Sequence, residues 1–311
     1  MLASVRALVT GGAGFIGSAI ARALVARGDE VRVFDNLLTG LDTNVPDGVE
    51  FVSGDLREAG EIAAACEGIE VVFHEAAFRS VPKSIDQPQL AQSCNVEGTL
   101  NLLMGAEAAG VRRVVYASSS SVYGGGEGIN REDAAPDPRS PYAVSKLAAE
   151  YYCRVWTLIK GLSTVSLRYF NVFGPGQRPD SQYSAVFPGF CDALVSGRAP
   201  ELHWDGEQSR DFSYIDDVVA ANLAAAQADE RVDGEVFNVG GGRPKTINEV
   251  LRAVSDALGT WIEPTRTPKR QGDVRHTRSD ISKARQLLGW EPQTSWEDAV
   301  AATVRWFADG V

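Results

Sequence analysis

The sequence predicts an α/β protein built on a doubly wound, parallel β-sheet. The first observation is a glycine-rich turn, Gly11 to Gly17, that separates a short β-type run from a segment with apolar residues at helical spacing. The second is that strand-like and helix-like segments alternate after this turn. The third is a shift in composition after residue 170 toward Pro, Gly and aromatic residues. These observations predict a Rossmann-type domain of residues 1–170 plus roughly 211–240, and a smaller C-terminal α/β domain of residues 171–210 and 241–311 that binds substrate.

The composition excludes several classes of protein. The chain has 311 residues, a formal net charge of −11, 44% hydrophobic residues and 23% charged residues, as in a folded globular protein. No excess of Lys and Arg is present to neutralise phosphates, so we expect no nucleic acid and no membrane as partner. No apolar run approaches the roughly 20 residues of a membrane span. The first strand begins too early for a signal peptide, so we expect a cytoplasmic protein.

The cysteines indicate neither zinc nor a disulfide framework. Cys66, Cys94, Cys153 and Cys191 are scattered, without C-x-x-C spacing and without a nearby His. We therefore expect reduced, buried thiols and no metal site.

The glycine turn predicts a dinucleotide site. Gly11 permits the tight turn, Gly14 lets the backbone approach a pyrophosphate, and Gly17 lets the following helix pack on the strand. The helix begins at Phe15 and Ile16, where free N–H groups and the helix dipole favour phosphate. The alternative is a glycine-rich turn without a ligand, and the surrounding strand, helix and acid argue against it.

The next strand ends on an acid. Residues 30–34 form a strand that ends on Asp35, about 20 residues beyond the turn, where a carboxylate can bind the adenosine ribose. Asp35 favours NAD over NADP because a 2′-phosphate would meet its charge, although the neighbouring Arg32 leaves NADP open.

Two more strands are predicted to end at the same edge. A strand over 49–52 runs into Asp55, which could bind the adenine amino group. After an Ala-rich helix near 58–66, the segment 70–77 forms a strand whose final small residues would lie beneath the cofactor.

A run of serines marks the next strand end. Gln87 to Ala109 predict a long helix pair that contains Asn95, and the strand 111–117 ends in Ser118 to Ser121. Ligands bind beyond the carboxyl ends of strands in such sheets, so the serines point at the site. Taken alone, such a run is more often a polar loop.

Tyr142 and Lys146 are candidates for proton transfer. They sit four residues apart on one helix face, so the ammonium can lie next to the phenol. A nearby cation, together with an oxidised nicotinamide ring, would lower the pKa of the phenol toward neutrality, so that Tyr142 can act as a base.

The C-terminal part contains candidate anion-binding residues. The segment 204–212 predicts a turn with an exposed Arg210, and 269–275 form a basic loop. Arginines in an acidic protein suit a second pyrophosphate, whereas solvated loops with surface ion pairs are the alternative.

Over nearly its whole length the chain resembles the extended short-chain dehydrogenase/reductase superfamily, and within it the nucleotide-sugar 4-epimerases. The motifs that carry the resemblance are Thr10–Gly17, Asp35-Asn36, Gly54–Leu56, His74–Ala77, Asn95–Thr99, Ser118–Gly124, Tyr142 with Lys146, Leu167–Asn171, Ser209–Phe212 and Arg270–Asp273.

The resemblance implies a tightly held NAD that is not consumed and a homodimer. Tyr142 would take the proton of the sugar 4-hydroxyl, Ser119 would hold that oxygen, and Lys146 would tune Tyr142 and bind the nicotinamide ribose. The implied cofactor-binding residues are Gly11, Gly14, Phe15, Ile16, Gly17, Asp35, Asn36, Asp55, Leu56, Ala76, Ala77, Asn95, Tyr142, Lys146 and Tyr169. The implied substrate-binding residues are Ser80, Ser119, Ser120, Asn171, Gln177, Arg178, Ala185, Val186, Arg210, Arg270, Asp273 and Thr277.

Departures from neighbouring families favour epimerisation. The resembling 4,6-dehydratases carry an Asp-Glu pair where Ser120 and Ser121 stand, and UDP-glucuronate decarboxylases carry Glu at the second position. A dinucleotide-binding regulator without turnover is a further alternative, and the presence of both Tyr142 and Lys146 argues against it.

The substrate signals disagree. The UDP-N-acetylglucosamine 4-epimerases are resembled by Ser80–Ser84, Gln177 and Asp273–His276, whereas the UDP-glucuronate 4-epimerases are resembled by Gln177–Asp180. Thr277 stands where epimerases of plain hexoses, such as UDP-glucose, carry a bulky Tyr, so we expect room for a substituted sugar. Arg178 favours UDP-glucuronate because a guanidinium can bind a C6 carboxylate through two hydrogen bonds. The alternative is that Arg178 pairs with Asp180 or another surface acid.

Overall fold

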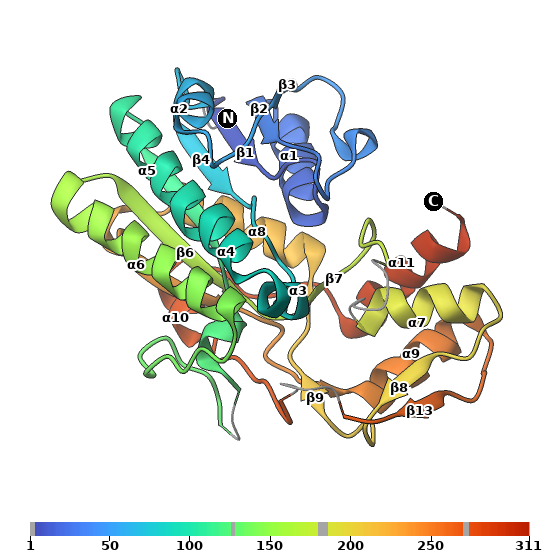
Figure 1. Ribbon diagram of the computed structural model, residues 1–311. Coiled ribbons are helices and arrows are strands. Elements are labelled where there is room, and N and C mark those ends of the chain that lie inside the picture. Colours follow the sequence, from blue (N-terminus) through green and yellow to red (C-terminus); the bar gives the residue numbers. More distant parts are fainter. Residues whose placement is uncertain (1–3, 126–127, 180–185, 270–273, 311) are drawn as a thin grey trace.

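A parallel sheet of seven strands forms the centre of the larger part of the molecule (Figure 1). The structure is a computed structural model, and it describes residues 4–125, 128–179, 186–269 and 274–310. The strand order is β11-β6-β5-β4-β1-β2-β3, so the chain leaves the centre at β1 in one direction and returns at β4 to build the other half. The strands are β1 (Arg6–Thr10), β2 (Glu30–Asp35), β3 (Glu50–Ser53), β4 (Val71–His74), β5 (Arg113–Ser119), β6 (Ser163–Tyr169) and β11 (Glu235–Val239). The predicted doubly wound sheet is confirmed, and its switch point lies between β1 and β4.

Helices cover both faces of the sheet. On one face α1 (Phe15–Arg27) and α8 (Ile215–Gln227) bury their apolar side chains against the strands. On the other face lie α2 (Ala59–Ala65), α5 (Gly98–Ala108) and α6 (Pro141–Lys160). Because both faces are covered, the central strands β4, β5 and β6 are almost continuously buried.

The predicted helix pair over 87–109 contains an irregular turn. After α3 (Val81–Asp86) come α4 (Pro88–Gln92), one turn of π-helix, η2 (Ser93–Glu97), and then α5. The π-turn holds Asn95, whose side chain is 2% exposed. Such turns are frequent at functional sites, because they redirect a side chain within a helix.

A second, smaller unit has an aromatic core of its own. It contains α7 (Val186–Val195), α9 (Ile247–Leu258) and α11 (Trp296–Ala308), at the lower right of Figure 1. Its short paired strands are β7 (Val172–Phe173) with β10 (Ser213–Tyr214), β8 (Glu201–His203) with β13 (Thr265–Thr267), and β9 (Ser209–Arg210) with β12 (Lys245–Thr246). The ring of Phe173 stacks on that of Phe187 with centroids 4.1 Å apart.

One segment packs differently from the predicted domain division. Residues 281–290, expected in the second domain, contain α10 (Ser282–Leu287), whose Ala284 joins the core of the large sheet. Trp290 joins the same core and donates from Nε1 to the carbonyl of Asp217 in α8. The segment 281–290 therefore packs on the first domain, before the chain returns to the second unit at α11.

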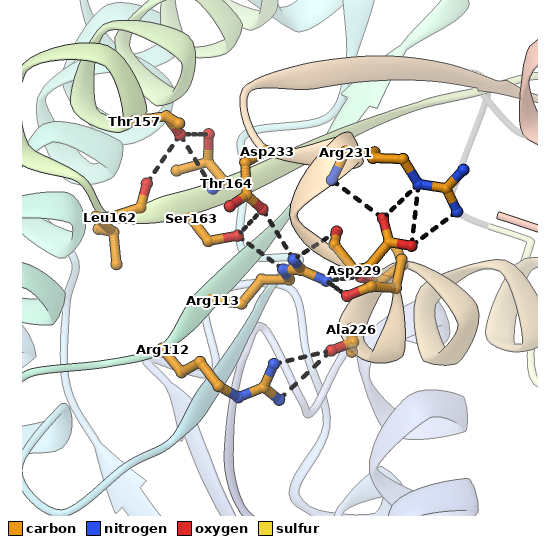
Figure 2. A network of polar contacts seen from close by, with 12 residues as sticks. Arg112, Arg113, Thr157, Leu162, Ser163, Thr164, Ala226, Asp229, Arg231 and Asp233 are labelled. Atoms are coloured by element: carbon orange, nitrogen blue, oxygen red, sulfur yellow. Dashed lines mark hydrogen bonds and ion pairs between the residues drawn. The ribbon is translucent and has the colours of Figure 1, made fainter. Parts of the chain in front are cut away.

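A buried arginine ties the end of α8 to the sheet (Figure 2). The guanidinium of Arg113, 4% exposed, donates to Ser163 Oγ at 2.7 Å and to Asp233 Oδ1 at 2.8 Å. It also donates to the carbonyls of Ala225 and Asp229 at 2.9 and 3.2 Å. These bonds satisfy carbonyls that the last turn of a helix leaves without partners, and they fix where the chain enters β11.

Candidate active site

The glycine turn forms a cradle open to an anion. Gly11 has φ +70°, and a Cβ there would lie 2.6 Å from the backbone nitrogen of Ala76, so only glycine fits. Gly14 caps α1 without a side-chain hydrogen bond, which leaves the N–H groups of the first turn, from Phe15 to Gly17, free for a ligand. These features fit the pyrophosphate of a dinucleotide.

Asp35 supports this turn from the end of β2. Its carboxylate accepts from the backbone N–H of Ala13 at 3.0 Å and of Leu37 at 2.8 Å. Arg32 is committed elsewhere, because it donates to Glu50 Oε2 at 2.9 Å and to the carbonyl of Ala65 at 2.8 Å. Arg32, whose charge could have favoured NADP, is thus bound to other groups and does not face the predicted cofactor site.

Asp55 lies next to Asn36 at the end of β3. The Asn36 amide donates to Asp55 Oδ2 at 2.9 Å, and Arg57 donates to both carboxylate oxygens. These bonds hold the pKa of Asp55 well below its ordinary value. The adjacent Leu56 is buried, with 7% exposed.

Buried hydrogen bonds hold the floor of the site. His74 bridges Thr10 and Thr99 at 2.8 and 2.9 Å, and burial lowers the pKa of its imidazole to about 3. Asn95 bonds both backbone groups of Phe78 and donates to Ser145 Oγ at 2.9 Å. The loop with Ala76 and Ala77, both half-buried, is thereby fixed beside the glycine turn.

Ser119 and Tyr142 meet at the carboxyl end of the sheet. Ser119 ends β5, and its Oγ accepts from the N–H of Ser121 at 3.2 Å. Tyr142 stands in the first turn of α6, whose N-cap is Ser140, and Ser119 is near enough to its phenol to lower the pKa of that group. Neighbouring Ser120, half-buried, begins the 3-10 turn η3 (Ser120–Tyr123).

The ammonium of Lys146 lies at a backbone carbonyl of β5. Its Nζ donates to the carbonyl of Ala117 at 2.7 Å and lies 4.9 Å from the centre of the Tyr116 ring. Burial lowers the pKa of Lys146 to about 8. Burial also raises the pKa of Tyr142, and the cation that lowers it is Arg79. The groups of the chain alone therefore do not bring the phenol toward neutrality.

Sequence reasoning missed Arg79 and Glu75. Both belong to the loop after β4. Glu75 stands in the motif His74–Ala77, in which only the alanines were given a role, and Arg79 lies between that motif and Ser80. Glu75 Oε1 accepts from the phenol of Tyr169 at 2.7 Å, and burial raises the pKa of Glu75 to about 7. The available signal was that an acid and an arginine flank the segment Ala76–Phe78 directly after a strand.

The predicted substrate residues lie on several elements. Ser80 is the N-cap of α3, and its Oγ accepts from the N–H of Lys83. Asn171 has φ +33°, a strained backbone that a polar asparagine tolerates, and its amide donates to the carbonyl of Asp211 at 2.8 Å. Thr277 Oγ1 accepts from the N–H of Asp211 at 3.2 Å. Val186, half-buried, is the first residue of α7. Ala185, Arg270 and Asp273 lie outside the described residues.

Three predicted substrate-binding residues differ in how exposed their side chains are. Gln177 is 7% exposed and donates to the carbonyl of Val172 at 2.9 Å, while its Oε1 is buried without a partner in the described chain. Arg178 is exposed. Arg210 is not the exposed arginine of a turn that was expected, because it lies half-buried in β9 and donates to the carbonyl of Ser209 at 2.9 Å.

Comparison with known proteins identifies the family. Residues 7–240 match the NAD dependent epimerase/dehydratase family. The chain belongs to this family. It is 38% identical to a UDP-glucose 4-epimerase of Mycolicibacterium smegmatis, over 97% of this chain and 98% of that protein. It is 33% identical to a UDP-glucuronate 4-epimerase of Thermodesulfobacterium geofontis, over 98% and 96%.

A solved structure agrees along the entire chain. The UDP-N-acetylglucosamine 4-epimerase from Methanobrevibacter ruminantium, in complex with UDP-N-acetylmuramic acid, superposes with a TM-score of 0.95 at 34% identity, and each chain is covered completely. The expected family, the epimerase class and the NAD cofactor are confirmed.

Two further features hold for the described residues. No helix among them is long and apolar enough to cross a membrane. Within the same ranges, no group of three or more His, Cys, Asp or Glu side chains is placed to hold a metal ion.

Proposed function

We propose that this chain is an NAD-dependent 4-epimerase of UDP-sugars whose substrate is UDP-glucuronate or its 4-epimer, UDP-galacturonate. The observation that supports the proposal is that Ser119 at the end of β5 lies near enough to Tyr142 of α6 to lower the pKa of its phenol, beside a turn shaped for a dinucleotide. NAD, when bound, supplies the hydride acceptor that later returns the hydride. The residues of the chain bind the sugar, hold its 4-oxygen and move one proton.

The proposed proton steps use Tyr142 and Ser119. Tyr142 takes the proton of the 4-hydroxyl as the hydride leaves C4, and Ser119 keeps the oxygen in place. After the hydride returns to the other face of the 4-ketone, Tyr142 gives the proton back, so the reaction consumes neither protons nor electrons. We propose that Asn171, Arg210, Ala185, Val186, Arg270 and Asp273 hold the UDP portion.

The test of this mechanism is Tyr142→Phe. The ring and its packing stay while the base is lost, so the variant should purify with NAD and lose epimerisation by about 10²-fold or more. Bound NAD is quantified after denaturation, and turnover is followed with UDP-sugars. Near-normal turnover in this variant would remove Tyr142 from the mechanism.

Arg178 supports the choice of UDP-glucuronate. Its guanidinium is exposed and makes no polar contact with the described residues, so it is available to a C6 carboxylate. Arg178→Ala should lower glucuronate turnover by about 30- to 150-fold, equivalent to roughly 2–3 kcal/mol, with UDP-glucose and UDP-N-acetylglucosamine nearly unchanged. An equal loss on all three substrates, or a wild-type preference for a neutral sugar, would replace this substrate.

Thr277 supports a second candidate, UDP-N-acetylglucosamine. The side chain is small, and its Oγ1 is turned to the backbone of Asp211. Thr277→Tyr should exclude substituted sugars and leave UDP-glucose turnover in place. Thr277→Ser is the control. Unchanged turnover of the substituted sugars by Thr277→Tyr would show that this position does not limit the pocket.

We also propose a homodimer formed through α6. Val144, Tyr151, Val155 and Leu158 follow one another at helical spacing and are exposed, Leu158 by 72%. Sedimentation velocity should give a dimer, and Leu158→Asp a monomer. The control is Leu38→Asp, a 64% exposed leucine outside the helices. The cytoplasmic location stays a prediction.

A further inference from the structure

Trp204 has a backbone conformation that large side chains rarely adopt. It follows β8 directly, and its φ is +63°, in the left-handed region that favours glycine. Its N–H donates to the carbonyl of Thr267 in β13 at 2.8 Å, so the neighbouring strand holds this turn in place. Strained conformations of this kind cost free energy and cluster at functional sites. The contacts of the Trp204 ring indicate what the side chain does there.

Two cations lie over the ring of Trp204, and neither is close to it in sequence. Lys269 Nζ is 4.2 Å from the ring centre and Arg275 Cζ is 4.5 Å from it, within the range of cation–π attraction. The neighbouring Asp205 accepts from Arg275 Nη1 through both carboxylate oxygens at 2.8 Å. Trp204 and Asp205 therefore hold the same guanidinium, the first through its ring and the second through its charge.

The ion pair alone would hold Arg275 weakly. The side chains of Arg275 and Asp205 are 35% and 45% exposed, and an ion pair in contact with water gains little free energy. Trp204 is half-buried, and tryptophan is the aromatic side chain that attracts a cation most strongly. A flat guanidinium over such a ring also has fewer orientations open to it. The ring of Trp204 thus strengthens a contact that would otherwise be loose.

The backbone that begins at Arg275 holds β9, the strand that carries Arg210. The carbonyl of Arg275 accepts from the N–H of Ser209 at 2.9 Å and from Arg210 Nη1 at 3.4 Å. His276 Nδ1 is hydrogen-bonded with Ser209 Oγ at 2.8 Å, and the N–H of Thr277 donates to the carbonyl of Ser209 at 3.1 Å. The place of Arg275 therefore determines where Arg210 and Thr277 lie.

We propose that Trp204 is a positioning residue of the substrate site, whose ring holds the Arg275 guanidinium so that the backbone of 275–277 places Arg210 and Thr277 against the UDP-sugar. This role rests on the proposed function, in which Arg210 holds the UDP portion and Thr277 borders the sugar. Loss of the ring should weaken substrate binding, and it should leave the proton transfer at Tyr142 as it is.

Trp204→Gly removes the ring and relieves the backbone at the same time. Because glycine adopts a positive φ readily, the variant should fold and keep its bound NAD. Isothermal titration calorimetry of the NAD-loaded protein with UDP should give a Kd about tenfold higher than in wild type. KM for the UDP-sugar that the wild type turns over should rise by a similar factor, with kcat within about twofold.

Two variants show whether the ring itself is responsible. Trp204→Tyr keeps an aromatic ring for the cations, so its Kd for UDP should stay within about threefold of wild type. The control is Trp261→Gly, at a 54% exposed tryptophan whose Nε1 donates to Glu263, and it should leave Kd and KM unchanged. A tryptophan needed only for folding would instead lower Tm and bound NAD in Trp204→Gly and leave KM unchanged in the folded protein.

Arg275→Gln tests the same contact from its other side and keeps Trp204 in place. It should weaken UDP binding by a similar factor, and the double variant with Trp204→Gly should lose little more, because both changes remove one contact. The inference is wrong if UDP binds Trp204→Gly or Arg275→Gln as it binds wild type, or if the two losses add. If the wild type itself neither binds UDP nor turns over a UDP-sugar, the proposed function fails instead, so the two failures are distinguishable.

Discussion

Arg168 and Glu150 form an ion pair directly beneath the serine end of β5. Their side chains are 4% and 3% exposed, and Arg168 donates to the carboxylate through Nε at 3.0 Å and Nη2 at 2.5 Å. Ser118, next to the proposed catalytic serine, donates to Glu150 Oε2 at 2.8 Å. Removal of one partner alone should therefore leave a charge buried within the site.

The expected cost follows from this burial. In Arg168→Leu the Glu150 carboxylate keeps Ser118 as its only side-chain hydrogen-bond donor among the described residues. An uncompensated buried charge of this kind costs about 3–5 kcal/mol. With about 2.1 cal/mol/K of unfolding entropy per residue, a chain of 311 residues has about 0.65 kcal/mol/K, so Tm should fall by about 5–8 °C. Replacing both partners, Arg168→Met with Glu150→Leu, should recover most of the loss.

Differential scanning calorimetry at fixed NAD concentration measures the difference. The control is Arg198→Leu, which breaks the exposed pair of Arg198 with Asp192 and should change stability by at most about 1 kcal/mol. The reasoning is refuted if Arg168→Leu unfolds within about 1–2 °C of the control, or if the double variant is less stable than the single one.

Three further perturbations test the fold and the cofactor site. Burial holds the pKa of His74 at about 3, below its unfolded value near 6.5, so the unfolded state binds the proton first. Stability should be fully present above pH 6.5 and fall by about 1.4 kcal/mol per pH unit below it, and a slope unchanged in His74→Gln would contradict this assignment. Gly11→Ala should lose bound NAD, because the added Cβ would clash with the backbone of Ala76. Gly28→Ala, which has open space around it and a φ of +88°, is the control and should keep NAD. Equal NAD content in the two variants would show that the close approach of the Gly11 turn to the Ala76 backbone is not required. Arg113→Met should lower the free energy of unfolding in urea by about 3 kcal/mol, because the buried acceptors drawn in Figure 2 lose their donor. The control Arg231→Met breaks an exposed ion pair and should lower it little. Similar losses in the two variants would speak against a stabilising role of the buried network.

The sequence predicted what local pattern controls. Alternating strands and helices gave the sheet, and the glycine spacing placed the cradle at the start of α1. The four-residue spacing placed Tyr142 and Lys146 on one helix, and the structure brings that helix to the end of β5. Each of these features depends on residues close in sequence or on the rule that parallel strands end at one edge.

What pattern could not supply is the environment of each side chain. Helical spacing puts Lys146 on the same face as Tyr142, yet the ammonium turns to the carbonyl of Ala117, which lies 29 residues away in sequence. Glu75 meets Tyr169 across 94 residues, and that long-range contact determines where its carboxylate lies. Burial of this kind is a property of the assembled sheet, since it exists only once β4, β6, α6 and α8 are in contact. The charges that decide which proton moves at neutral pH are therefore a tertiary property, even where every residue that carries them stands in a recognisable motif.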